Sequence, residues 1–214
     1  MNYLSHAYRF FDEPYFVAGT ALPDWMNVVD RRNRTRSQYA EPLRDSSDAL
    51  VRDVARGVIQ HHDDDRRFHQ TSIFVELSTR FAVQARHYLA PGLGHQAGFL
   101  GHIVVELLLD WVLMDRDASR LTRYYEVLES LDASQLERAA NLICRHPVDK
   151  LVVLLPRFIN ERFLADYSDD ERLLWRLGGV MRRVKLPELP EDLIGWLATI
   201  RPIVAAHADE LLAF

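Results

Sequence analysis

Gly98-Phe-Leu-Gly-His102-Ile-Val-Val-Glu106-Leu-Leu-Leu-Asp110-Trp-Val-Leu-Met114 is the most apolar stretch of the chain, and it decides the fold class. Its only ionisable side chains, His102, Glu106 and Asp110, follow one another at intervals of four residues. Four residues advance an α-helix by about 400°, so these side chains share one face of a helix that is apolar elsewhere. Such a helix is buried, and buried carboxylates need a proton, a cation or hydrogen-bond donors. The stretch is therefore predicted to be a core helix that carries a polar stripe.

The rest of the chain shows the same helical periodicity. Apolar residues recur at three- and four-residue spacings, and no segment alternates polar and apolar residues as a strand does. We expect an all-α protein of 214 residues that forms one domain, a helical bundle. Seven of the nine histidines lie between His6 and His102. Residues 1–115 are therefore expected to carry the functional site, and residues 116–214 to form a helical scaffold.

The composition argues against several classes of protein. There are 26 Lys and Arg residues against 31 Asp and Glu, a net charge of −5, which argues against a general binder of nucleic-acid duplexes. The single cysteine, Cys144, forms no intramolecular disulfide and fits a reducing cytoplasm. The N-terminus lacks the pattern of a secretory signal, and Phe99–Met114 is shorter than the roughly 20 residues that a membrane span needs. We expect a cytoplasmic protein without a membrane span; its oligomeric state is left open.

A second polar stripe precedes the first. His61, Asp65 and His69 also follow at four-residue steps, with Asp64 beside them. Two such helices packed face to face would place imidazoles and carboxylates around one ion, as in other helical bundles. Two structural alternatives stay open: a solvated helix face for residues 61–69, and a polar cluster without metal for residues 102–110. In the second alternative, Asp110 caps a helix or pairs with an arginine.

Two N-terminal residues extend the set of candidate ligands. His6 lies in Asn2-Tyr-Leu-Ser-His6, and Asp24 lies in Gly19-Thr-Ala-Leu-Pro-Asp24. Each has a structural alternative, because a histidine on an apolar face is often a satisfied core residue and an acid directly after a proline can cap a helix.

Taken together, these segments resemble the bacterial acyl carrier protein phosphodiesterase family over roughly residues 1–115. The resemblance rests on the NxLxH start, the Gly-x-x-x-x-Asp segment, the series Gly57-x-x-x-His61-x-x-x-Asp65-x-x-x-His69 and the later polar helix. That family consists of all-helical, metal-dependent relatives of the HD-domain phosphohydrolases. The resemblance implies an HD-domain-like fold and an enzyme that releases the phosphopantetheine arm of acyl carrier protein.

The resemblance also assigns ligands. The family's first histidine maps to His6, its early aspartate to Asp24, and its central pair to His61 and Asp65. The chain departs from the family at His69, where the family has an aspartate, and at the later helix, where it has His102 and Glu106 instead of two acids. These exchanges keep residue types that bind metals. The expected metal ligands are His6, Asp24, His61, Asp65, His102 and Glu106.

A shorter resemblance points to the same chemistry. Gly19-Thr-Ala-Leu-Pro-Asp24-Trp, followed by histidines and a Gly-His-x-x-x-Glu helix, is similar to zinc-dependent phospholipase C. Alternatively, the doublet His62-Asp63 supplies the central ligands, in place of His61 and Asp65. Both resemblances imply a phosphoester substrate.

The expected activity is that of a metal-dependent phosphodiesterase. Imidazole and carboxylate ligands without thiolate suit Mn²⁺ or Zn²⁺, with Fe²⁺ and Mg²⁺ as alternatives. Asp64 or His69 is expected to handle the proton, and Arg66 to neutralise phosphate charge. A basic loop would steer an acidic carrier protein, and it contains Arg31, Arg32, Arg34 and Arg36. The alternatives are a catalytically silent helical interaction protein and a hydrolase of nucleotides or phospholipids.

Overall fold

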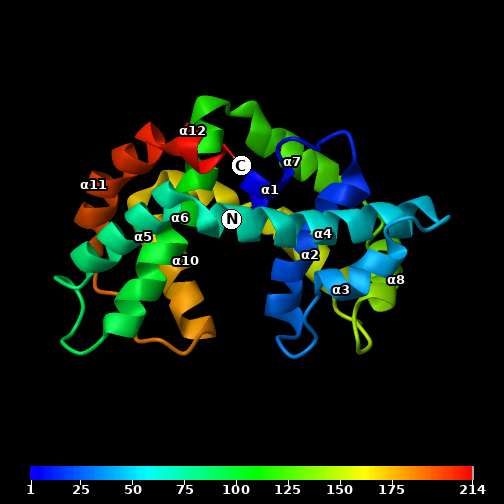
Figure 1. Ribbon diagram of the computed structural model, residues 1–214, viewed down its shortest axis with the longest axis horizontal. Helices are drawn as coiled ribbons and strands as arrows, with labels where there is room; N and C mark the ends of the chain where they lie inside the picture. The colour runs from blue at the N-terminus through cyan, green and yellow to red at the C-terminus, as the bar shows by residue number, and fades with distance from the viewer. Residues whose placement is uncertain (214) are drawn as a thin grey trace. The chain divides into compact units, whose positions relative to one another are not determined.

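The computed structural model describes residues 1–213, and all regular structure in this range is helical (Figure 1). The α-helices are α1 (Tyr3–Ala7), α2 (Pro14–Val29), α3 (Ser37–Ala40), α4 (Ala49–Gln70), α5 (Ser72–Ala85), α6 (Gly94–Arg116), α7 (Ser119–Glu129), α8 (Ala133–Ile143), α9 (Leu151–Glu161), α10 (Asp170–Arg183), α11 (Leu193–Ala206) and α12 (Ala208–Leu211), and the 3₁₀ helices are η1 (Glu41–Leu43) and η2 (Phe163–Ser168). The all-α prediction is confirmed.

The chain divides into two compact units built from interleaved segments. Unit 1 contains residues 1–2, residues 67–117 and the described residues from Phe163 onward, and unit 2 contains residues 3–66 and 118–162. Each unit takes segments from both halves of the chain. The units therefore do not coincide with the expected site half, residues 1–115, and scaffold half, residues 116–214.

In unit 2, helix α2 lies at the centre of the packing between helices. Pro14 occupies its first turn, where a missing N–H leaves no hydrogen bond unmade. The helix contacts α1, α7, α8 and α9. Trp25 of α2 is fully buried and meets Phe158 of α9 edge to face, with 5.4 Å between the ring centroids. Tyr3 of α1 meets the same Phe158 ring edge to face at 4.9 Å, so α1, which carries His6, packs beside α2.

A close crossing of α2 and α4 depends on two glycines, Gly19 and Gly57. A Cβ atom built on Gly57 would lie 2.2 Å from the carbonyl oxygen of Phe16, and one built on Gly19 would lie 2.3 Å from that of Val54. Such distances are far inside van der Waals contact, so only glycine permits this approach. As a result, the backbone of α2 lies directly beside the turn of α4 that precedes His61.

In unit 1, the predicted core helix is α6. It begins at Gly94, earlier than the apolar stretch itself, and packs along α5 and against α11 and η2. By length and composition α6 is apolar enough to cross a membrane, but 72% of its most apolar window is buried inside the fold. It therefore has the burial of a core helix, as the sequence predicts.

The acidic cluster of residues 63–65 lies inside one unbroken helix. Helix α4 runs from Ala49 to Gln70, and Thr71 then caps α5, because its hydroxyl accepts a hydrogen bond from the backbone N–H of Phe74. Two of the expected metal ligands, His61 and Asp65, therefore lie on α4, together with His69.

Candidate metal centres

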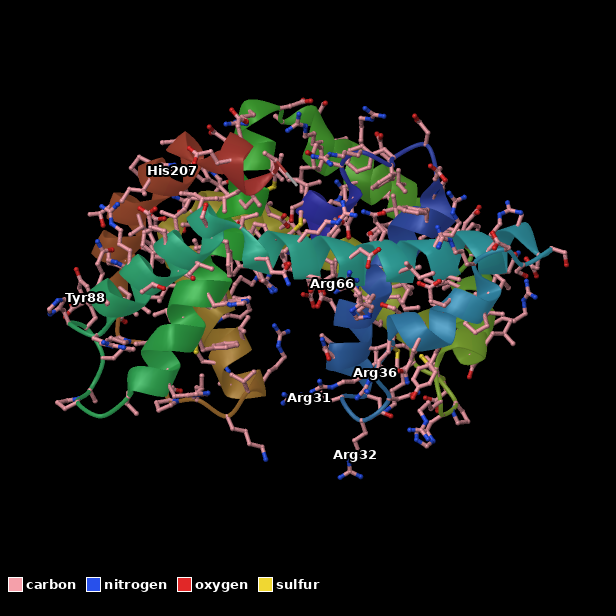
Figure 2. The ribbon with its side chains drawn as sticks, viewed as in Figure 1. Arg31, Arg32, Arg36, Arg66, Tyr88 and His207 are labelled. Carbon is pink, nitrogen blue, oxygen red and sulfur yellow. The ribbon has the colours of Figure 1, made fainter. Side chains whose placement is uncertain are left out.

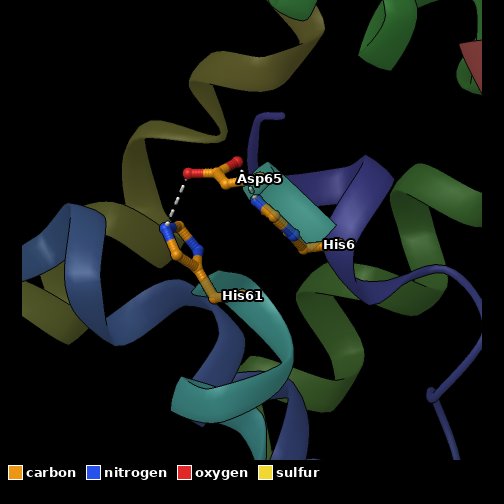
Figure 3. Close-up of side chains that lie close together, drawn as sticks. All are labelled: His6, His61 and Asp65. Atoms are coloured by element: carbon orange, nitrogen blue, oxygen red, sulfur yellow. Dashed lines mark ion pairs between the residues drawn. The ribbon is translucent and has the colours of Figure 1, made fainter. Parts of the chain in front are cut away.

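The first candidate centre lies in unit 2 and consists of His6 from α1 with His61 and Asp65 from α4 (Figure 3). One ligand atom from each side chain lies within 4.8 Å of the other two. His6 is 2% exposed and His61 is 4% exposed, and their rings stack with 4.3 Å between centroids. We call this set the unit 2 centre.

His61 has a defined tautomer. Its Nδ1 lies 2.8 Å from the backbone oxygen of Thr20 in α2, and a carbonyl oxygen only accepts, so Nδ1 carries the hydrogen. Burial holds the pKa of His61 well below its ordinary value, and the nearby His6 acts in the same direction. The imidazole is therefore neutral, and the lone pair of Nε2 lies 3.5 Å from Oδ2 of Asp65. Two acceptors at this distance favour a cation between them.

His6 is oriented in the same way, by a carboxylate. Its Nδ1 donates to Oδ2 of Asp64 at 3.1 Å, and Oδ1 of Asp64 accepts from Nε2 of Gln60 at 2.6 Å. Nε2 of His6 is buried without a hydrogen-bond partner, 3.4 Å from Oδ1 of Asp65. A histidine bonded through one ring nitrogen to a carboxylate, with the other nitrogen open, is the usual arrangement of a metal-binding histidine.

The electrostatics of the unit 2 centre also favour positive charge. Burial opposes a charged His6, but the carboxylates of Asp64 and Asp65 outweigh it and raise the pKa of the imidazole. Burial likewise opposes a charged Asp65, yet the nearby imidazole of His6, 3.4 Å away, holds the pKa of that carboxyl well below its usual range. The centre therefore holds an ionised carboxylate, which would stabilise a cation bound beside it.

The second candidate centre lies in unit 1 and consists of His69 at the end of α4 with His102 and Glu106 from α6. Nε2 of His69 lies 2.8 Å and Nε2 of His102 lies 3.1 Å from Oε1 of Glu106. The amino group of Met1 lies 3.3 Å from the same oxygen. We call His69, His102 and Glu106 the unit 1 group.

Glu106 is ionised although it is buried. Burial opposes the charge, but the ammonium of Met1 and the imidazoles of His102 and His69 hold the pKa of this carboxyl well below its usual range. One turn further along α6, the fully buried Asp110 accepts a hydrogen bond of 2.9 Å from the amide of Asn2. Asp110 lies inside α6, which continues to Arg116, so it does not cap that helix.

The residues predicted to hold one ion are divided between the two groups. His6, His61 and Asp65 lie in the unit 2 centre, whereas His102 and Glu106 lie in the unit 1 group. Asp24 belongs to neither group. It is half-buried inside α2, which begins at Pro14, so the suggestion that Asp24 caps this helix is wrong.

The predicted catalytic residues occupy three different environments. Asp64 is bonded to His6 and Gln60, a place suited to orienting His6. His69 is a member of the unit 1 group. Arg66 is exposed and pairs with Asp63 on the same face of α4.

The alternative ligand pair, His62 and Asp63, is not brought together. Nε2 of His62 donates to the backbone oxygen of Thr35 at 2.9 Å, and Asp63 is paired with Arg66. Among the described residues, the cluster of ligand atoms contains His61 and Asp65 instead.

The basic loop between α2 and α3 is anchored by buried polar residues that alternate with exposed arginines. Asn33 and Thr35 are buried between them, and the Asn33 amide donates to the backbone oxygen of His146 at 2.7 Å. The side-chain oxygen of Asn33 also accepts from the N–H of His146 at 3.2 Å. The four exposed residues are Arg31, Arg32, Arg34 and Arg36, and Figure 2 labels all of them except Arg34.

We expect Asn33→Ala to lower the free energy of unfolding by about 1–3 kcal/mol, because it leaves the backbone N–H and C=O of His146 without these partners. Urea denaturation followed by circular dichroism measures the change. Gln38→Ala, at an exposed residue of α3, is the control and should leave stability within about 0.5 kcal/mol. Equal stability of the two variants would contradict the anchoring role.

Several contributors to these centres were not expected from the sequence. They are the carbonyl of Thr20, the amide of Gln60 and the amino group of Met1. A backbone carbonyl leaves no mark on a sequence, whereas Gln60 precedes Asp64 by four residues on the same helix face and is a detectable signal.

Comparisons of the chain with protein-family models, with curated proteins and with solved structures give no match. The function of the chain is therefore inferred from the geometry of its side chains.

Proposed function

We propose that the chain is a metal-dependent phosphoric ester hydrolase, a phosphodiesterase, that holds its cation at the unit 2 centre. The observation that carries the proposal is Nε2 of His6, which is buried without a hydrogen-bond partner beside Asp65. Leaving such an atom unpaired is costly, and a bound cation removes that cost. Two imidazoles and one carboxylate without thiolate fit Mn²⁺ or Zn²⁺.

The donor set suits a catalytic rather than a structural ion. Three protein donors leave coordination positions for water and for a substrate oxygen. A bound divalent cation would polarise the phosphoryl group and lower the pKa of a water molecule at this position. Asp65 supplies the negative charge that retains the cation. Asp64 and the carbonyl of Thr20 keep the two imidazoles in the tautomers that bind it.

A charged substrate fits the surface of unit 2. The anchored loop presents arginines whose planar guanidinium groups match phosphate oxygens in geometry and charge. Together with the resemblance to the acyl carrier protein phosphodiesterases, this loop favours a phosphodiester carried by an acidic protein, the phosphopantetheine arm of acyl carrier protein. The proposed location is the cytoplasm, where such a carrier would be met.

One observation favours a second candidate, a catalytically silent helical interaction protein. Glu106 is paired with the ammonium of Met1, and Asp110 is bonded to Asn2, so the buried acids of α6 have partners within the chain. If this candidate is correct, the polar residues of both units stabilise the fold and take no part in metal binding or catalysis.

Reconstitution with metal distinguishes the two candidates. Protein stripped with a chelator should hydrolyse bis-p-nitrophenyl phosphate and phosphopantetheinylated carrier protein only after Mn²⁺ or Zn²⁺ is added, and activity should rise with metal occupancy. A nucleotide diester and a phospholipid, tested in parallel, rank the substrate classes. If no substrate is turned over by protein that contains one equivalent of metal, the hydrolase proposal fails.

A further inference from the structure

The unit 1 group has a geometry that the proposed hydrolase centre does not use. His102 and Glu106 are one turn apart on α6, and His69 reaches the same carboxylate oxygen from the end of α4. The two imidazoles lie close together, with 4.6 Å between ring centroids. Phe74 of α5 packs against both, at 4.9 Å from each ring centroid, and fixes their positions.

The spacing of the donor atoms is that of ligands around one ion. Metal–ligand distances near 2.0–2.2 Å place neighbouring ligand atoms roughly 3–3.5 Å apart. Nε2 of His69 and Nε2 of His102 lie 2.8 and 3.1 Å from Oε1 of Glu106, close to this range. A small shift of either imidazole would therefore admit an ion without rebuilding the helices.

Access and charge complete the site. The side chain of His69 is 32% exposed and that of His102 is 40% exposed, whereas that of Glu106 is 9% exposed. A cation can thus reach the imidazoles from solvent and meet a buried negative charge behind them. The ammonium of Met1 touches the same carboxylate oxygen, so a cation entering the site would replace a positive charge that is already there.

We propose that His69, His102 and Glu106 form a second divalent-cation site, contained within unit 1 and independent of the unit 2 centre. Two imidazoles and a single carboxylate suit borderline first-row ions, Zn²⁺ above all, whereas Mg²⁺ and Ca²⁺ prefer sites made of oxygen ligands. In this role His69 is a metal ligand, in place of the proton-transfer role that the sequence suggests. The proposal does not depend on the hydrolase activity.

Zn²⁺ binding to the full chain in a background that lacks the unit 2 centre tests the site. Asp65→Ala removes the carboxylate of that centre, and equilibrium dialysis against Zn²⁺ then counts the remaining equivalents. We expect one equivalent to remain bound. Adding His69→Ala or His102→Ala to this background should weaken the remaining site by at least 100-fold. Both substituted side chains are partly exposed, and circular dichroism confirms that the helices persist.

The matched control is His95→Ala, at an exposed histidine on the same helix α6, and it should leave Zn²⁺ binding unchanged. A second readout is the visible spectrum of bound Co²⁺, which should change on substitution of His69 or His102 but not of His95. If the Asp65→Ala protein binds no Zn²⁺, or if its binding survives both His69→Ala and His102→Ala, the second site is refuted. The first of these outcomes leaves the hydrolase proposal intact. If the protein binds Zn²⁺ at the unit 1 group but has no hydrolase activity, the hydrolase proposal is rejected and the second cation site stands.

Discussion

Replacing Asp63, Asp64 and Asp65 one at a time by alanine is expected to have three different effects on metal binding and hydrolysis at the unit 2 centre: none, partial loss and complete loss. Asp63→Ala should have no effect on either, because this partly exposed carboxylate pairs with Arg66 and belongs to neither group of ligand atoms. Asp64→Ala should weaken metal binding by about 10- to 100-fold, as expected for a residue that orients a ligand. Asp65→Ala should remove the unit 2 metal and the turnover that depends on it.

The differences follow from geometry, since the three residues are chemically identical and adjacent. One residue advances a helix by about 100°, so neighbouring aspartates face different directions. Asp65 lies 3.4 Å from His6 and 3.5 Å from His61, whereas Asp64 contacts His6 on its Nδ1 side and is held by Gln60. Asp64 therefore acts through the tautomer of His6, and Asp65 acts on the cation itself.

The measurement is metal content by mass spectrometry together with the rate of diester hydrolysis at saturating metal. Asp64→Asn is a useful fourth variant, because its amide oxygen still accepts from Nδ1 of His6 and should restore part of the affinity. A structural role for the cluster predicts the opposite pattern: all three variants would differ only in stability, and none in metal content. Equal losses for Asp63→Ala and Asp65→Ala would likewise reject the assignment.

The helical spacing in the sequence predicted which side chains share a face of a helix. It did not predict which other helix packs against each turn of that face. His61, Asp65 and His69 follow at four-residue steps along α4, as expected. The first two meet α1, whereas His69 meets α6, because the packing partner of each turn is set by tertiary contacts between distant segments. Periodicity alone carries no information about those contacts.

Helix boundaries explain other differences between prediction and structure. The core helix was recognised from its composition, yet α6 begins at Gly94, because residues before the apolar run extend it. Asp24 follows Pro23 and has the local pattern of a cap, but α2 had already begun at Pro14. Pro23 lies inside α2 and does not end it. Tertiary packing can override the low helix propensity of a single residue in this way. His6 was a candidate as a histidine on an apolar face, and its assignment as a ligand came from the family resemblance and not from helical spacing.

Gly57→Ala is expected to lower the free energy of unfolding by about 3 kcal/mol or more and to weaken metal binding at the unit 2 centre. The new methyl group would lie 2.2 Å from the backbone oxygen of Phe16, and a backbone atom in a packed helix cannot move aside as a flexible side chain can. Helix α2 must therefore shift away from α4. Thr20 lies on the same stretch of α2, so its carbonyl would move away from Nδ1 of His61.

Two controls separate steric clash from the general effect of replacing glycine in a helix. Gly195→Ala in α11 meets no atom within 4 Å and should raise stability by up to about 1 kcal/mol, since alanine favours the helix. Gly19→Ala presses on the same crossing from the other helix and should resemble Gly57→Ala. Urea denaturation gives the stabilities, and Zn²⁺ or Mn²⁺ titration of the folded fraction gives the affinities. A loss below about 1 kcal/mol in Gly57→Ala would show that α2 and α4 are not in backbone contact, and the placement of His61 against Thr20 would then fail with it.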